Sequence, residues 1–136
     1  MNSGVRFLWI ALLGISVHPL FGQLDLRLET SKSSYLQYAP IPLTVNLKNL
    51  GGEELILAEQ PGQPWLELIV QSTDGLMLKA DRPLSLAPLT LQPGESRSLP
   101  LDLAPFFLVR ETGGYRVRAS VRLPSGETLL TEPLPF

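Results

Sequence analysis

The chain has 136 residues, with 11 Lys and Arg against 13 Asp and Glu, a net charge of −2 and no cysteine. This length fits one domain, and the absence of cysteine excludes disulfide bonds. The small, mixed charge argues against a nucleic-acid-binding protein, because such proteins concentrate basic residues on one face.

Residues 1–22 have the order of features found in secretory signal peptides. Arg6 supplies a positive charge, residues 7–17 form an eleven-residue apolar run, and a proline and the small residue Gly22 follow. The run is shorter than the roughly 20 apolar residues that a membrane-spanning helix needs. We therefore predict cleavage after Gly22 and an exported mature domain, residues 23–136, that is periplasmic or extracellular and has no membrane span. An uncleaved signal anchor is the alternative.

The predicted mature domain offers few groups for catalysis. The one histidine of the chain, His18, falls in the predicted signal peptide, and there is no thiol. This excludes Ser-His-Asp and Cys-His catalytic sites and zinc sites with the usual ligands. The sequence also lacks an Asp-x-Asp loop that would indicate a calcium site. We expect no enzymatic activity, no catalytic residues, no metal and no cofactor.

Alternation of apolar and polar residues predicts strands along the mature domain. Successive side chains of a strand point to opposite faces, so each alternating segment marks a strand with one buried and one exposed face. The predicted strands are 24–29, 43–48, 55–58, 65–72, a row of Leu99, Leu101 and Leu103, 115–122 and 128–136. Nothing predicts a helix, because 13 prolines and 11 glycines are spread along the chain.

Proline and glycine predict the segments between the strands. Pro40 and Pro42 favour an edge or a crossover over a central strand. Residues 82–91 are rich in proline and are predicted to be irregular, with their leucines under the edge of the sheets. Residues 92–95, Gln-Pro-Gly-Glu, fit a type II turn, which places Pro second and Gly third.

The segment 115–122 is the clearest strand. Tyr, Val, Ala and Val at 115, 117, 119 and 121 alternate with Arg116, Arg118, Ser120 and Arg122. A strand with one dry face belongs to an antiparallel sheet that covers a core. The sequence therefore predicts an all-β protein, an antiparallel β-sandwich of about seven to nine strands.

Three segments resemble bacterial immunoglobulin-like domains. Residues 42–52 are similar to the strand and turn "l-x-v-x-l-x-N-x-G" of such domains, 91–96 to "l-x-P-G-E-S", and 113–119 to "p-G-x-Y-x-v-x-A". The resemblance implies an immunoglobulin-like fold for residues 23–136. It implies little about function, because sandwiches of this type have many unrelated roles. The same segments are also similar to BsuPI-type proteinase inhibitors.

The three tyrosines are expected to be structural. Tyr115 heads the inward row of its strand, where a tyrosine corner would bond its hydroxyl group to nearby backbone. Tyr35 and Tyr38 are expected to pack under an edge strand.

Trp65 is the first candidate contact with a partner. It follows the polar turn-forming segment 60–64, and an exposed Trp is typical of the centre of an interface. The alternative is that the indole caps the core beside Phe106 or Phe107. Adjacent residues of an extended segment point to opposite sides, so one of these two phenylalanines is expected to be partly exposed.

Arg116, Arg118 and Arg122 are the other candidate contacts, as a basic stripe on the outward face of their strand. Such a stripe suits an anion or an acidic partner. The alternative is a solvated face whose arginines pair with cross-strand carboxylates such as Glu67 or Glu132.

We therefore predict an exported, non-catalytic immunoglobulin-like module of the cell envelope that binds another exported protein or a surface component. The alternative is a small secreted proteinase inhibitor of the BsuPI-like type. Such an inhibitor needs an exposed rigid loop, for which 60–64 and 82–88 are the candidates.

Overall fold

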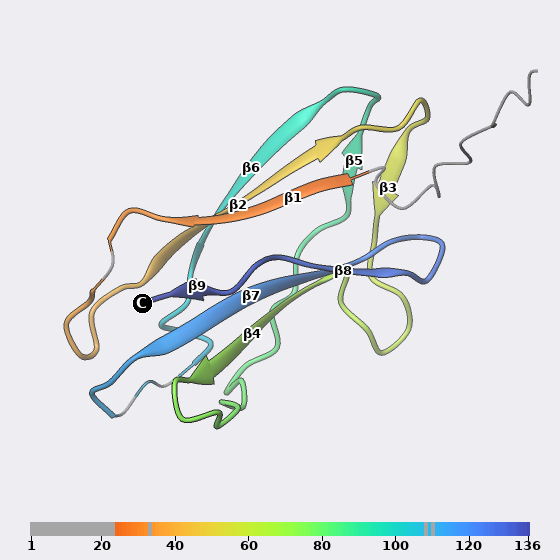
Figure 1. The fold of residues 1–136 in the computed structure, drawn as a ribbon. Helices are drawn as coiled ribbons and strands as arrows, with labels where there is room; N and C mark the ends of the chain where they lie inside the picture. The colour runs from red at the N-terminus through yellow and green to blue at the C-terminus, as the bar shows by residue number, and fades with distance from the viewer. Residues whose placement is uncertain (1–23, 33, 108, 110) are drawn as a thin grey trace, which may run out of the picture.

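The computed structural model describes residues 24–32, 34–107, 109 and 111–136. The predicted signal peptide, residues 1–22, lies outside them. The described residues are all β: they form nine strands, all paired antiparallel, and no helix. The two larger sheets lie one over the other as a β-sandwich (Figure 1). The predicted fold class, including the number of strands, is confirmed.

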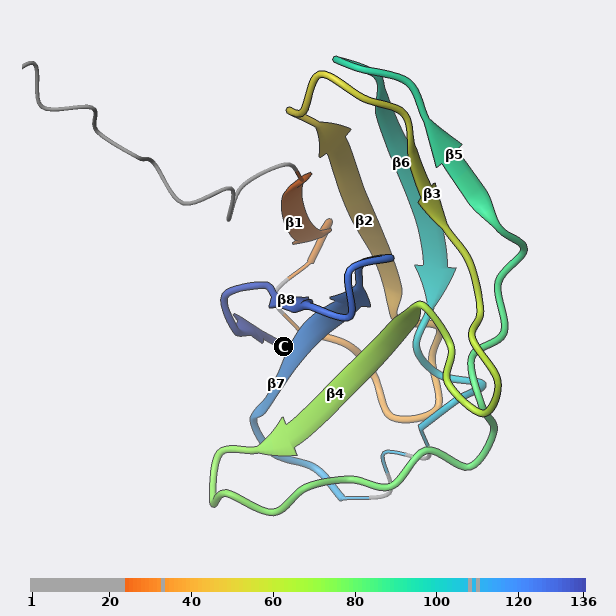
Figure 2. The same ribbon diagram turned by 90° about the vertical axis from the view of Figure 1, so that its right-hand side faces the viewer.

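The first sheet has three strands in the order β1-β2-β6. These are β1 (Leu24–Thr30), β2 (Pro42–Asn49) and β6 (Ser96–Asp102). A separate two-stranded ribbon pairs β3 (Leu55–Leu57) with β5 (Leu89–Leu91) (Figure 2).

The second sheet is built around β7, which has a neighbour on each side. One side pairs with β4, and the other pairs first with β8 and then with β9. These strands are β4 (Leu66–Ser72), β7 (Tyr115–Arg122), β8 (Thr128–Leu130) and β9 (Leu134–Pro135).

The core is filled by the inward rows that the alternation predicts. β7 buries every second residue from Tyr115 to Val121, and β2 and β4 bury their rows in the same way. The row of β2 is Leu43, Val45 and Leu47, and the row of β4 is Leu66, Leu68 and Val70. Side chains of the two facing sheets thus form one hydrophobic cluster.

The last predicted strand is interrupted by a bulge. Ser120 lies opposite Leu130 and Val117 opposite Leu134, so β8–β9 fits one more residue than β7 over this stretch. Thr131 sits between them, and its Oγ1 accepts a bond from the backbone N–H of Ala119 at 3.0 Å. An extra residue of this kind bends an edge strand and ends its regular pairing.

Two segments differ from the sequence-based expectation. Residues 82–91 were expected to be irregular, but 89–91 form β5, because β3 lies alongside and supplies a partner. Pro42 was assigned to an edge or crossover, whereas it begins β2, the middle strand of its sheet. A first position suits proline there, since it tolerates the missing N–H group.

The turn 92–95 has the predicted type II form. Gly94 has φ +76°, and the N–H group of Glu95 donates to the carbonyl of Gln92 at 2.9 Å. A positive φ at this position is why glycine is required.

Asn49, at the end of β2, ties this turn to the rest of the fold. Its side chain is 1% exposed, and its Nδ2 donates to the carbonyls of Glu53 at 2.8 Å and Leu91 at 3.0 Å. Its Oδ1 accepts from the N–H of Gly51 at 2.9 Å. Its backbone N–H and carbonyl bond to Glu95 and Gly94 of the turn. One side chain therefore joins β2, the following loop and β5.

We predict that Asn49→Asp lowers the free energy of unfolding by about 3 kcal/mol, because the carboxylate keeps the acceptor but loses both donors and faces two carbonyl oxygens. Urea unfolding monitored by circular dichroism measures this. Asn46→Asp is the matched control on the same strand, because Asn46 only accepts, from Ser98 Oγ at 2.7 Å. The control should change stability by less than about 0.5 kcal/mol. Equal midpoints for the two variants would contradict the role of Asn49.

Candidate functional site

Three loops and the last residue meet at one end of the sandwich. The loops are 34–41 between β1 and β2, 73–78 after β4, and 111–114 before β7 (Figure 1). Phe136 lies beside them, because its backbone pairs with that of Tyr115. We call this region the loop end.

Two open hollows flank the segment 111–114 at the loop end. The larger, of about 410 Å³, lies between this segment and residues 34–38. The smaller, of about 340 Å³, lies between it and the turn that follows β4. Both are lined by apolar and polar groups and open to solvent.

Exposed apolar side chains surround these hollows. Leu36 is 83% exposed and Tyr38 78% on one side, and Leu76 is 70% exposed and Met77 57% on the other. Exposed apolar groups that gather in one region, unlike scattered ones, mark interaction surfaces. The loop end is therefore the strongest candidate for a contact surface in the described part of the chain.

Hydrogen bonds and a ring contact connect the segments of the loop end to one another and to the start of β7. The hydroxyl of Tyr115 donates to the carbonyl of Glu111 at 2.6 Å, which is the backbone bond expected of a tyrosine corner. The ring of Tyr115 stacks on Phe136 with centroids 5.6 Å apart. The N–H of Thr73 donates to the carbonyl of Gly114 at 2.9 Å. A Cβ atom on Gly114 would lie 2.9 Å from Thr73 Cγ2, so any larger residue there requires the Thr73 side chain to shift.

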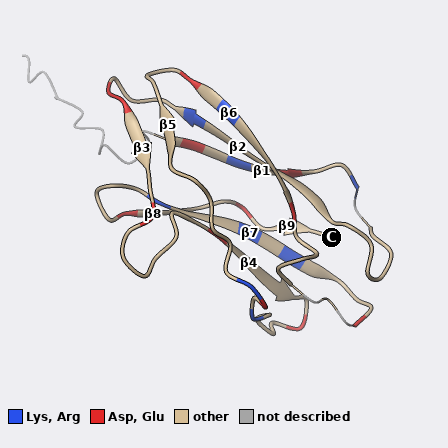
Figure 3. Ribbon diagram, turned by 180° about the vertical axis from the view of Figure 1, so that it is seen from behind, with Lys and Arg blue, Asp and Glu red and all other residues tan. Residues whose placement is uncertain are grey.

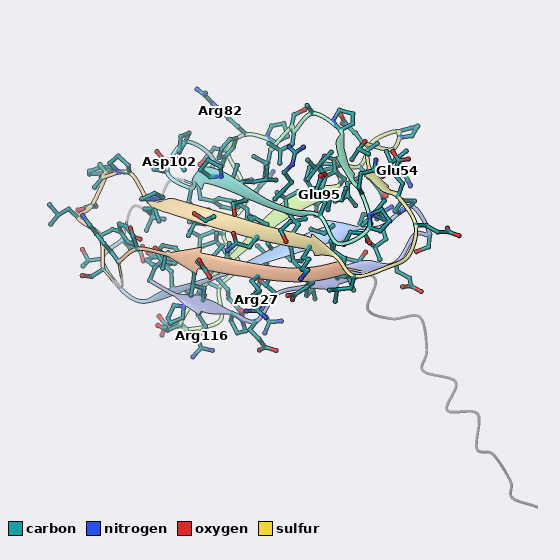
Figure 4. The ribbon with its side chains drawn as sticks, turned by 90° about the horizontal axis from the view of Figure 1, so that it is seen from above. Arg27, Glu54, Arg82, Glu95, Asp102 and Arg116 are labelled. Carbon is teal, nitrogen blue, oxygen red and sulfur yellow. The ribbon has the colours of Figure 1, made fainter. Side chains whose placement is uncertain are left out.

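Arg116 and Arg118 lie on the outward face of β7, as predicted. Both are exposed, and Arg116 extends away from the sandwich (Figure 4). Their cross-strand neighbours on β4 are Gln71 and Ile69. Together with Pro133 these four residues line a small hollow of about 40 Å³. We call this pair the arginine face, and Figure 3 shows its basic residues along β7.

The alternative interpretation of the basic stripe, a solvated face whose arginines pair with cross-strand carboxylates, is right about the exposure of Arg116 and Arg118 and wrong about the pairing. The ion pairs of the described residues join Arg27 to Asp25 and Arg97 to Glu95, and none involves Arg116, Arg118 or Arg122. Glu67 lies opposite Ser120, which is two residues along β7 from Arg118.

Arg122 does not belong to the arginine face. It is half-buried and lines a hollow of about 140 Å³ with Ile56, Ala58 and residues 59–60. The structure therefore brings two of the three predicted arginines together and places the third toward the other end of β7.

Trp65 is not a surface contact, so this prediction is wrong. The residue is 2% exposed and belongs to the same core cluster as Phe107. Its Nε1 donates to the carbonyl of Ala87 at 3.2 Å, which satisfies the polar atom of the indole. The alternative, that Trp65 caps the core, is confirmed.

Several loop-end residues were missed or misplaced from the sequence. Leu36, Leu76 and Met77 fall in turn regions, where alternation predicts neither burial nor exposure. Tyr38 was expected to pack under an edge strand but is exposed, with φ 63°. Tyr35 is half-buried, as expected, and its hydroxyl bonds to Thr30 Oγ1. The sequence signal that could have identified Leu36, Leu76 and Met77 is that they are apolar residues within otherwise polar turn regions.

Two further features were sought among the described residues, a metal-binding cluster and a membrane-spanning helix. No three His, Cys, Asp or Glu side chains gather in a way that would hold a metal ion. The same part of the chain contains no helix long and apolar enough to cross a membrane.

Comparison with known proteins adds no family. A scan against protein-family models finds no match, and a search of curated proteins finds none. The likeness to immunoglobulin-like domains therefore rests on the three sequence segments.

The burial of Trp65 predicts the wavelength of its fluorescence emission and its sensitivity to quenching. The only other tryptophan is Trp9, so a protein with Trp9→Phe reports on Trp65 alone. Because a buried indole is shielded from water, we expect blue-shifted emission and much weaker quenching by iodide than in the urea-unfolded protein. Quenching of equal strength in both states would contradict the burial of Trp65.

Proposed function

We propose that this protein is an exported, non-catalytic binding module of the immunoglobulin-like type, and that it contacts another exported protein through the loop end. The observation that carries the proposal is the group of exposed apolar side chains around two hollows. The hydrogen-bonded frame under them supports it, because a pre-organised surface loses less entropy on binding. The signal-peptide pattern of residues 1–22 supports export.

The arginine face extends this proposed contact surface. Arg116 follows Tyr115 directly, and Gln71 opposite it lies near the end of β4, so the face begins beside the loop end. Arginine is well suited to carboxylates through its planar, forked set of donors. A partner with acidic groups next to an apolar patch fits both parts.

Site-specific photo-crosslinking in cells tests the proposed contact. A photoreactive amino acid at Leu36 or Met77 should capture one dominant exported protein, because these side chains would lie in the interface. The same amino acid at Ile56, an exposed apolar residue on β3, is the control and should capture none. Equal capture from all three positions, or none, would contradict the loop end as the interface.

A negative charge at the same positions tests how much these apolar side chains contribute to the free energy of partner binding. The double variant Leu36→Asp with Met77→Asp should reduce co-purification of that partner at least tenfold. This corresponds to a loss of at least about 1.4 kcal/mol of binding free energy. Its unfolding midpoint should stay close to that of the parent, since both side chains are exposed. Ile56→Asp is the matched control and should bind normally. Unchanged binding by the double variant would contradict the proposal.

A secreted proteinase inhibitor is the second candidate, and one observation favours it. In the segment 82–88, Leu84 and Leu86 are half-buried while their neighbours are exposed, and Ala87 is held by the bond from Trp65. This anchored, exposed segment suits an inhibitory loop. The other predicted loop, 60–64, is closed into a tight turn by two backbone bonds between Gln60 and Gln63, so it does not present an extended backbone as 82–88 does.

An inhibition assay against a panel of secreted endopeptidases separates the two candidates. Inhibition that Ser85→Pro abolishes would favour the inhibitor. Rapid cleavage within 82–88 without inhibition would contradict the proteinase-inhibitor function.

A further inference from the structure

The outer edges of the two large sheets differ in how they are protected against an additional strand. β6 contains Pro100, and β8–β9 has a bulge with nearby prolines, and these features discourage strand pairing. β4 is covered: Leu66 and Leu68 are 1% and 9% exposed, and the carbonyl of Val70 accepts from the N–H of Leu78 at 2.9 Å. β1 has neither a proline nor a bulge. It is therefore the edge that none of these features protects.

The hydrogen bonds of β2 show which of its residues face β6. The N–H of Asn49 donates to the carbonyl of Glu95, and the N–H of Leu103 donates to the carbonyl of Ile41, both at 3.0 Å. Bonding groups alternate along an antiparallel strand, so the odd-numbered residues of β2 bond to β6 and the even-numbered ones bond to β1.

The same alternation fixes the direction of the backbone groups in β1. The even-numbered residues of β2 lie opposite Asp25, Arg27 and Glu29, so the N–H and carbonyl groups of these three residues bond to β2. The groups of residues 24, 26, 28 and 30 point outward, away from the sheet. Leu24 is 5% exposed as a whole residue, so its outward groups are covered.

The outward groups of β1 are open from residue 26 onward. Leu26 and Leu28 pack against the core cluster, yet both stay partly exposed at the margin of the sandwich. Among the described residues, none forms a hydrogen bond with the outward backbone groups of Leu26, Leu28 or Thr30. Arg27, on the same strand, marks this margin in Figure 4. An edge with unpaired backbone groups is a template for another strand.

The solvent face of β1 carries charges of alternating sign. Asp25, Arg27 and Glu29 follow one another on this face, and Arg27 Nε lies 3.4 Å from Asp25 Oδ2. Glu29 is exposed, and its carboxylate forms no ion pair with another described residue. Like charges directly opposite each other destabilise a pair of strands, whereas opposite charges stabilise it. The edge therefore rejects most strands and accepts one whose charges are complementary in register.

A second copy of β1, antiparallel to the first, meets this condition in one register. With Arg27 opposite Arg27, or Glu29 opposite Glu29, like charges face each other. With Leu26 opposite Leu26, the pairing needs the covered groups of Leu24. With Leu28 opposite Leu28, Arg27 of each copy lies opposite Glu29 of the other, and every backbone group that is used is an open one.

We propose that two copies of this protein associate through β1, antiparallel and centred on Leu28, so that their first sheets join into one. Leu28 would exchange backbone bonds with Leu28 of the second copy, and Leu26 with Thr30. Arg27 and Glu29 of the second copy would form a pair without backbone bonds, in which Cα atoms are about 4.5 Å apart and side chains lie close together. A twofold axis makes each contact occur twice. The contact uses none of the exposed side chains of the loop end, so its test is separate from that of the proposed function.

Light scattering and amide hydrogen exchange at increasing protein concentration test the open edge and its occupant. The purified protein should pass from monomer to dimer between micromolar and millimolar concentration. The amides of Leu26, Leu28 and Thr30 should become protected over the same range, whereas the amide of Arg27, which bonds to β2, should be protected throughout. A monomer at every concentration would overturn the proposal.

The exchange pattern also distinguishes other occupants of the edge. Protection of Leu26 and Leu28 that does not depend on concentration would overturn the proposal, because the edge would then be covered within one chain. Protection that appears only when a co-purifying exported protein is added would assign the edge to that protein and would overturn it as well.

Charge reversal tests the register. Arg27→Glu places two carboxylates opposite each other and Glu29→Arg places two guanidinium groups opposite each other, so each variant should weaken dimerisation about tenfold or more, because the unfavourable pair occurs twice. An equimolar mixture of the two variants should associate as a heterodimer, since opposite charges then face each other at both positions. A mixture that stays monomeric would overturn the proposal.

Arg97→Glu is the matched control for these variants. Arg97 is an exposed residue of β6, at the opposite edge of the same sheet, and its Nη2 lies 4.0 Å from Glu95 Oε1, a same-strand contact like that of Arg27. This variant should dimerise like the parent. All of these side chains are exposed, so the unfolding midpoints should stay close to that of the parent. Equal dimerisation by Arg27→Glu, Glu29→Arg and Arg97→Glu would overturn the proposal.

Discussion

The buried side chain of Asn49 is the interaction on which the arrangement of this sandwich depends. It stands where β2 ends, and both its donors and its acceptor are used on backbone groups of different segments. Those bonds join the first sheet to the ribbon of β3 and β5, and the backbone of the same residue holds the turn before β6. An apolar residue there would leave buried carbonyls without partners, which costs more than the bonds themselves contribute. A protein without disulfides needs connections of this kind between its sheets.

The opposite end of the molecule is held by aromatic packing and backbone pairing around Tyr115. The last residue, Phe136, both pairs with Tyr115 and stacks on its ring, so the chain end is part of the structure of the loop end. The tyrosine hydroxyl then fixes the start of the segment that separates the two hollows. A rigid base with apolar side chains projecting from it is the combination that an interface requires, because little order remains to be imposed on binding.

The proposed contact surfaces share one physical property: each is a place where the sandwich leaves groups unpaired. At the loop end these are apolar side chains without a packing partner. On the arginine face they are guanidinium groups without carboxylate partners among the described residues. Trp65 shows the contrast, because its ring is packed and its N–H group is bonded, so nothing remains for a partner to satisfy.

The sequence by itself determined the inward rows of β2, β4 and β7, the type II turn at Gly94 and the exposure of Arg116 and Arg118. Side-chain alternation and the φ preference of glycine are local properties, and they act the same way wherever the segment lies. Only the tertiary structure decided that 89–91 pairs with β3, that Trp65 is buried, and that Leu36, Tyr38 and Met77 are left exposed. Short strands, loop residues and edges depend on which distant segment lies next to them, and no pattern along the chain carries that information.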